Sequence, residues 1–209
     1  METNLINKIL NHFIVKRIKD YENIEGWLTK NEALALYMIA NKLPQKATVV
    51  EIGSWQGKST YCIAKGLKSG NIYAIDPFNA DAGLDIDSAD TYVKQKGDKS
   101  LLGIFCDNMR KYNVEKKVIV KEGYSNDFFS HFTKIDFLFI DGDHSIEGCK
   151  NDYQLYANKI VKGGFIAFHD YYNDRPLLGP TFVVNKIINQ SNDFTFYRQS
   201  DSLWIGIKS

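Results

Sequence analysis

From Thr48 onward, short apolar runs alternate with helix-like stretches, and this alternation constrains the fold more than any other feature of the chain. The runs are TVVEI (48–52), NIYAI (71–75), KVIVK (117–121), IDFLFI (135–140) and GFIAFH (164–169). Between the last two, apolar residues recur every three or four positions, which is typical of one face of an amphipathic helix. Strands that are apolar on both faces and separated by helices predict a parallel sheet of βαβ units.

The end of the chain departs from this alternation. FTFYRQS (194–200) and SLWIGIK (202–208) are strand-like runs with almost no linker between them, so they predict an antiparallel hairpin. We therefore expect an α/β fold of the Rossmann-like, doubly wound kind, with a mostly parallel seven-stranded sheet that ends in this C-terminal hairpin. A polar, Asp-rich insertion at 77–98 interrupts the pattern.

The beginning of the chain has the apolar spacing of helices at residues 5–18 and 30–42. We expect these N-terminal helices to form a cap, residues 1–45, beside a main domain, residues 46–209. The apolar residues near the N-terminus are interrupted by polar ones, so the pattern of a signal peptide is not present there.

Composition excludes several classes of partner. Lys and Arg total 26 against 25 Asp and Glu, a formal net charge of +1, so no global field favours nucleic acid or an acidic membrane. The three cysteines form no CxxC pair, which argues against structural zinc or a disulfide framework and favours a reducing, cytoplasmic location. The longest apolar run, 33–40, is far below the ~18 residues needed to span a bilayer. We expect a small molecule as partner.

The stretch EIGSWQGKST, residues 51–60, follows the first predicted parallel strand. Ligands of open α/β sheets bind beyond the carboxyl ends of the strands, and Gly53 and Gly57 let the backbone turn tightly close to a ligand. The stretch differs from a nucleotide-binding P-loop, because three residues rather than four separate the two glycines. A nucleotide hydrolase stays open as an alternative, since FLFIDGD at 137–143 could serve as a magnesium-binding strand. A strand-to-helix turn that binds no ligand is a second alternative.

Asp76 ends the second predicted parallel strand, about 20 residues beyond the glycine turn. A carboxylate there can accept hydrogen bonds from both ribose hydroxyls of an adenosine cofactor, which a nucleotide hydrolase does not need. The same residue could instead start a turn before Pro77. Together with the glycine turn, Asp76 favours an adenosine cofactor.

Two polar clusters follow the last two predicted parallel strands, IDGDHS at 140–145 and FHDYY at 168–172. If these strands are neighbours, His169 and Asp170 lie close to Asp141, and converging carboxylate and imidazole groups indicate a divalent metal site. One polar residue of the first cluster could instead cap the following helix.

These motifs resemble a known family. VEIGSWQGKST, IDGDHSIEGCKNDY and KGGFIAFHDY resemble class I S-adenosylmethionine-dependent methyltransferases, and within them the bacterial group of family 24 methyltransferases, which is related to sugar O-methyltransferases. The resemblance covers roughly residues 24–175. It implies an enzyme that transfers the methyl group of S-adenosyl-L-methionine to a hydroxyl of a sugar or another small-molecule acceptor.

The resemblance also implies residues for the methyl donor. Glu51 would support the turn near the methionine ammonium, Asp76 would bind the ribose, and residues 123–125 would hold the adenine. The cofactor-binding residues that it implies are Glu51, Gly53, Ser54, Gly57, Ser59, Asp76, Gly123, Ser125 and Asp141.

For the acceptor side the resemblance implies metal ligands at Asp141, His169 and Asp170, for magnesium or another divalent metal. Histidine departs from the oxygen-rich ligand set of the metal-dependent relatives, and imidazole suits transition metals better. Asp143 resembles the general base of the sugar-modifying relatives, and His144 or His169 is the alternative base if no metal takes part. The sequence leaves open which acceptor and which metal bind, and whether the chain forms a homo-oligomer. A non-catalytic cofactor-binding module on the same fold also remains as an alternative function.

Overall fold

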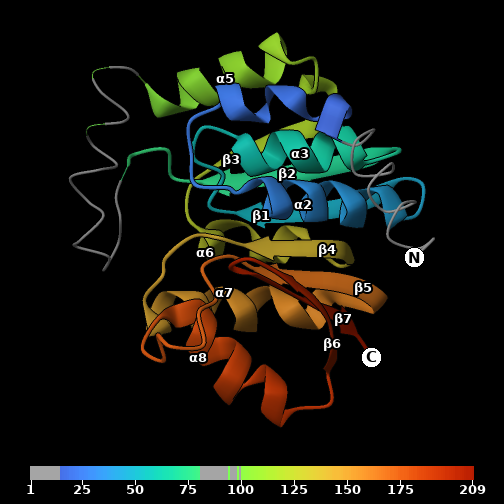
Figure 1. The fold of residues 1–209 in the computed structure, drawn as a ribbon, viewed down its shortest axis with the longest axis vertical. Helices are drawn as coiled ribbons and strands as arrows, with labels where there is room; N and C mark the ends of the chain where they lie inside the picture. Colours follow the sequence, from blue (N-terminus) through green and yellow to red (C-terminus); the bar gives the residue numbers. More distant parts are fainter. Residues whose placement is uncertain (1–14, 81–93, 95–97, 99) are drawn as a thin grey trace, which may run out of the picture.

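The computed structural model of the protein describes residues 15–80, 94, 98 and 100–209, which fold around one twisted sheet with helices on both faces (Figure 1). Most of the helix expected at 5–18 and most of the insertion at 77–98 lie outside the described residues. Within the parts of the chain that the structure describes, no helix is both long and apolar enough to cross a membrane.

The sheet has seven strands in the order β3-β2-β1-β4-β5-β7-β6. Their bounds are β1 Ala47–Ile52, β2 Gly70–Asp76, β3 Val118–Glu122, β4 Ile135–Ile140, β5 Ile160–Phe168, β6 Phe194–Ser200 and β7 Leu203–Lys208. Strands β1 to β5 pair in parallel, and β7 pairs antiparallel with both β5 and β6. The predicted doubly wound sheet with a C-terminal hairpin is therefore confirmed. The chain leaves β1 towards β2 and later continues on its other side with β4, so the switch point of the sheet lies between β1 and β4.

Helices cover both faces of the sheet (Figure 1). One face carries α2 (Lys30–Lys42), α3 (Lys58–Gly66) and α5 (Leu101–Lys111), and the other carries α6 (Ser125–Phe128), α7 (Ile146–Tyr156) and α8 (Gly179–Lys186). The 3-10 helices are η1 Lys19–Asn23, η2 Glu115–Lys117, η3 Phe129–His131, η4 Ala157–Lys159 and η5 Ile188–Gln190. Successive strand residues point to opposite faces, so Val49 packs in one core and Val50 in the other. This explains why the central strands are apolar throughout.

Helix α2 packs in the same core as α3 and the sheet. Ala33, Leu36 and Ala40 are fully buried there. The helix begins in a capping box, in which the Thr29 hydroxyl accepts from the Glu32 amide and the Glu32 carboxylate accepts from the Thr29 amide. The sequence TKNE thus fixes the start of the helix, and the division into segments 1–45 and 46–209 stays a prediction.

The loop after β1 needs glycine at position 53. Gly53 has a φ of 88°, in the left-handed region, and a Cβ placed on it would lie 2.0 Å from the carbonyl oxygen of Asp141. Gly163 also has a positive φ, 76°, but a Cβ there would meet nothing within 4 Å. The two glycines thus share the backbone requirement and differ in the space around them.

This difference predicts unequal losses of stability. We expect Gly163→Ala to lower the free energy of unfolding by about 1–2 kcal/mol, the cost of a left-handed backbone with a Cβ. Gly53→Ala should lose a further 1–3 kcal/mol or so, because the methyl group overlaps the backbone after β4. Urea denaturation of the two variants measures both losses, and an equal loss would show that the β4 loop moves aside freely.

Candidate functional site

A cavity of about 1080 Å³ opens at the carboxyl ends of β1, β2, β4 and β5. Its wall is completed by the segment 25–28 ahead of α2 and by the turn between β6 and β7. Ligand pockets are typically about 300–1,000 Å³, so this cavity lies at the upper end of the usual size range.

The glycine loop forms the floor of the cavity, and Glu51 lies beneath it. The Glu51 side chain is fully buried and accepts hydrogen bonds from the hydroxyls of Ser54 (3.1 Å), Ser59 (2.5 Å) and Thr60. Burial raises the pKa of Glu51 to about 7, although the three hydroxyls oppose this. Among the cofactor residues predicted in this loop, Gly53, Ser54 and Ser59 line the cavity, whereas Glu51 and Gly57 do not.

Asp76 lies on the cavity wall at the end of β2. Its two carboxylate oxygens accept hydrogen bonds from the amides of Trp55 (2.8 Å) and Phe78 (2.6 Å). Burial raises the pKa of Asp76 above its ordinary value, although these backbone hydrogen bonds oppose it. A carboxylate oxygen has two lone pairs, so Asp76 can hold the glycine loop and still accept hydrogen bonds from a ligand.

At the end of β3, Gly123 and Ser125 line the far side of the cavity. The Ser125 hydroxyl donates to the Asp152 carboxylate (2.5 Å), and burial raises the pKa of Asp152 to about 7. Sequence reasoning missed Asp152, which also lines the cavity. The sequence signal that could have indicated it is its spacing, because Asp152 lies three residues after Cys149 and so falls on the buried face of α7.

On the opposite side of Gly53, three side chains converge: Asp141, His144 and Asp170. The Nε2 atom of His144 lies 3.5 Å from Oδ1 of Asp141 and 3.3 Å from Oδ2 of Asp170. One ligand atom from each of the three residues falls within a mutual distance of 4.8 Å. Two carboxylates and an imidazole are a donor set that fits a divalent cation.

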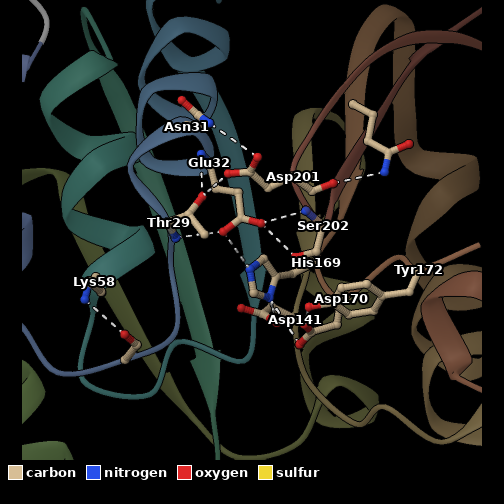
Figure 2. A network of polar contacts seen from close by, with 12 residues as sticks. Thr29, Asn31, Glu32, Lys58, Asp141, His169, Asp170, Tyr172, Asp201 and Ser202 are labelled. Atoms are coloured by element: carbon tan, nitrogen blue, oxygen red, sulfur yellow. Dashed lines mark hydrogen bonds and ion pairs between the residues drawn. The ribbon is translucent and has the colours of Figure 1, made fainter. Parts of the chain in front are cut away.

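His169 bridges this cluster to α2 (Figure 2). Its Nδ1 lies 3.2 Å from both Asp141 Oδ1 and Asp170 Oδ2, and its Nε2 lies 3.3 Å from Glu32 Oε2. The structure thus brings together the predicted metal residues Asp141, His169 and Asp170. It also places the imidazole of His144, which the sequence suggested as a base, against the same two carboxylates.

The charges of this network support one another. Burial alone would lower the pKa of His169, but the charge of Asp141 and hydrogen bonds with Asp141, Asp170 and Glu32 raise it well above its ordinary value. Burial would raise the pKa of Asp170, but its hydrogen bond and ion pair with His169 lower it to about 2. Asp170 also has a positive φ, 55°, an uncommon backbone conformation that clusters at functional sites.

Asp143, the predicted base, lies on the cavity wall at the start of α7. Its Oδ1 accepts a hydrogen bond from the Ser145 amide (2.8 Å), while the Ser145 hydroxyl caps α7 through the Gly148 amide (3.0 Å). Asp143 therefore shapes the turn into α7. Among the described residues, no side-chain hydrogen bond involves its second carboxylate oxygen.

Comparison with known proteins identifies related chains. A family model described as a methyltransferase domain matches residues 50–171. Uncharacterized protein R132 of Acanthamoeba polyphaga mimivirus is 32% identical over 145 residues, 68% of this chain and 59% of that protein. The chain thus spans less than two thirds of the length of this curated relative.

Solved structures share the fold. The O-methyltransferase from Bacillus cereus in complex with SAH has a TM-score of 0.65 at 14% identity, over 96% of this chain and 97% of that chain. The O-methyltransferase TomG from Streptomyces achromogenes, involved in tomaymycin synthesis and solved with SAM, has a TM-score of 0.64 at 12% identity, over 95% of this chain and 89% of that one. At these identities the likeness shows a common fold.

The buried Glu51 predicts a pH dependence of stability. Its pKa is about 7 in the folded chain against an ordinary 4.5, so the folded state binds more protons than the unfolded state between these values. Stability due to this group is therefore fully present below pH 4.5 and is lost as pH rises through 7. A pKa difference of this size corresponds to about 3 kcal/mol.

We expect Glu51→Gln to remove this titration. Between about pH 4 and about pH 8, the free energy of unfolding of the variant should gain about 3 kcal/mol relative to the parent. Urea denaturation of both proteins across this range gives the difference, in which the other titrating groups cancel. A difference that stays constant with pH would mean that the pKa of Glu51 is the same in the folded and the unfolded chain.

Proposed function

Because the chain belongs to the family of methyltransferase domains, we propose that it is an S-adenosyl-L-methionine-dependent O-methyltransferase that acts on a sugar or another small molecule with a hydroxyl group. The observation that carries this proposal is one cavity with two chemically different ends. Asp76 and the glycine loop stand at the donor end, and Asp141, His144 and Asp170 stand at the acceptor end.

The charge of the cavity favours this donor over a nucleoside triphosphate. Acidic side chains outnumber Lys and Arg on the wall. S-adenosyl-L-methionine carries a sulfonium and an ammonium group, which an acidic wall attracts, whereas a triphosphate would be repelled. In this proposal Asp76 accepts hydrogen bonds from the ribose hydroxyls, and the pair of Ser125 and Asp152 offers polar atoms to the adenine. The relatives from Bacillus cereus and Streptomyces achromogenes, solved with SAH and SAM, support the same class of donor.

The reaction at the acceptor end is an in-line displacement. A bond forms between the acceptor oxygen and the methyl carbon while the bond from that carbon to sulfur breaks, which leaves a methyl ether and S-adenosylhomocysteine. Such a transfer depends on holding the two reacting atoms in line within one cavity. Asp143 accepts the proton of the acceptor hydroxyl, and the exposed ring of Trp27 gives the wall an apolar surface against the acceptor.

Asp141, His144 and Asp170 would hold a divalent cation at this end. A cation bound there would lower the pKa of a hydroxyl group that contacts it. His169 holds the two carboxylates from behind, so the ligand atoms are oriented before any ligand binds.

Donor binding is tested at Asp76. Asp76→Ala should weaken S-adenosyl-L-methionine binding by at least about tenfold, since losing a charged hydrogen-bond partner costs about 1.5–3 kcal/mol. Isothermal calorimetry measures this, with Asp107→Ala, a carboxylate on the exposed face of α5, as the matched control. ATP serves as the second ligand. Binding of ATP but not of S-adenosyl-L-methionine by the parent would replace the proposal by a nucleotide hydrolase, and donor binding without methyl transfer would indicate a non-catalytic module.

The base is tested by a pair of substitutions. Asp143→Asn keeps the shape of the side chain and removes its basicity, so donor binding should survive while turnover falls by on the order of a hundredfold. His144→Gln should instead weaken the response of turnover to added divalent cation. Turnover of a hydroxyl acceptor, measured as S-adenosylhomocysteine released, separates the two. Parent-like turnover in Asp143→Asn together with cation-independent loss in His144→Gln would make His144 the base.

A further inference from the structure

Glu32 is a buried carboxylate at the start of α2 that reaches the acceptor end of the cavity. It is 1% exposed. One oxygen accepts from the Ser202 amide (2.9 Å) and the Ser202 hydroxyl (2.7 Å), and the other accepts from the Thr29 amide (2.8 Å) and faces Nε2 of His169 (3.3 Å). Both oxygens are therefore surrounded by donors.

Figure 2 shows the contacts that run from Glu32 through His169 to Asp141 and Asp170. His169 presents one ring nitrogen to Glu32 and the other to Asp141 and Asp170. Two carboxylates that converge on one point repel each other unless a donor or a cation lies between them. An imidazole ring keeps its orientation when a carboxylate holds one of its two nitrogens. Such a carboxylate thereby helps to orient the groups that contact the other nitrogen.

We propose that Glu32 is a positioning residue, which acts through His169 to hold Asp141 and Asp170 in the arrangement that binds a cation and orients the acceptor. This inference rests on the proposed function for its use of the acceptor end. Glu32 would thus serve the site in addition to its place in the capping box of α2.

If Glu32 served only to cap α2, the effects of substitutions at Thr29 and Glu32 would differ from those that the proposal predicts. Thr29→Ala removes the hydroxyl half of the capping box but leaves the carboxylate of Glu32 facing His169. Glu32→Gln leaves the volume unchanged but puts an amide donor against Ser202 or against Thr29 and His169, because glutamine has only one acceptor oxygen. The two variants therefore separate loss of the helix cap from loss of the contact with His169.

The experiment is a double-substitution cycle on the full chain. Glu32→Gln, His169→Gln and the double variant are compared with the parent, with Thr29→Ala as control, for Mn²⁺ affinity by calorimetry, turnover, and S-adenosyl-L-methionine affinity. We expect Glu32→Gln to lower Mn²⁺ affinity and turnover by about 10–100-fold and to leave donor affinity unchanged. In the His169→Gln background the same substitution should have no further effect, since the link is already broken.

The inference is overturned by parent-like Mn²⁺ affinity and turnover in Glu32→Gln, by an equal loss in Thr29→Ala, or by losses that multiply in the double variant. If Glu32→Gln does not fold, Ser202→Ala, which removes one donor to Glu32, should show a smaller loss of the same kind. If the parent transfers no methyl group, the proposed function is refuted. The Mn²⁺ affinities of the parent and the variants then test the positioning role of Glu32 by themselves. If the parent also binds no Mn²⁺, crystal structures decide: unmoved Asp141 and Asp170 side chains in Glu32→Gln refute the inference.

Discussion

The hydrogen-bond ladder of the parallel strands continues one residue beyond the strands, and the site is built on this continuation. The Gly53 amide donates to the Ile75 carbonyl (2.9 Å), the Asp141 amide to Ile52 (2.8 Å), and the His169 amide to Ile140 (3.1 Å). At the outer side the Gly123 amide donates to Asp76 (3.0 Å). Each first residue after a strand is thereby fixed to its neighbour, so the site residues inherit the rigidity of the sheet. Groups held in this way need little reordering when a ligand binds.

The carboxylates of the cavity divide into two kinds according to what faces them. Glu51 and Asp152 face mainly hydroxyl groups in buried surroundings, and burial raises the pKa of each to about 7. Glu32 is buried and Asp170 is half-buried, and hydrogen bonds and ion pairs with His169 lower the pKa of each to about 2. Near pH 7 the same residue types are therefore partly protonated under the loops at the donor end and fully charged around His169. The charged carboxylates therefore lie at the end of the cavity to which the proposed function assigns the acceptor.

The sequence predicts the parts of this structure that depend on local pattern. Each strand of the sheet could be located because an apolar run is a signal contained within a few residues. The order of helices and strands along the chain then restricts the sheet to few topologies. Asp141 and Asp170 could be paired because they end strands that follow each other along the chain. Glu32 could not be found in this way. It lies 137 positions from His169, and TKNE at 29–32 is fully explained by a capping box. The role of His144 depends on the turn between β4 and α7, whose geometry is set by side-chain caps rather than by periodicity.

Two segments far apart in the sequence, 29–32 and 201–202, meet at the acceptor end of the cavity. Thr29 donates to Asp201 (2.6 Å) and Glu32 accepts from Ser202, so the start of α2 is hydrogen-bonded to the turn between β6 and β7. That hairpin pairs along β5, the strand that carries His169 and Asp170 at its end. The donor end is formed by the first half of the sheet, β1 to β3, whereas the acceptor end needs β4 and β5, the C-terminal hairpin and α2 together. Under the proposed role of Glu32, changes that break its contact with Ser202 or with His169 reach Asp141 and Asp170, whereas the loops at the donor end stay unaltered.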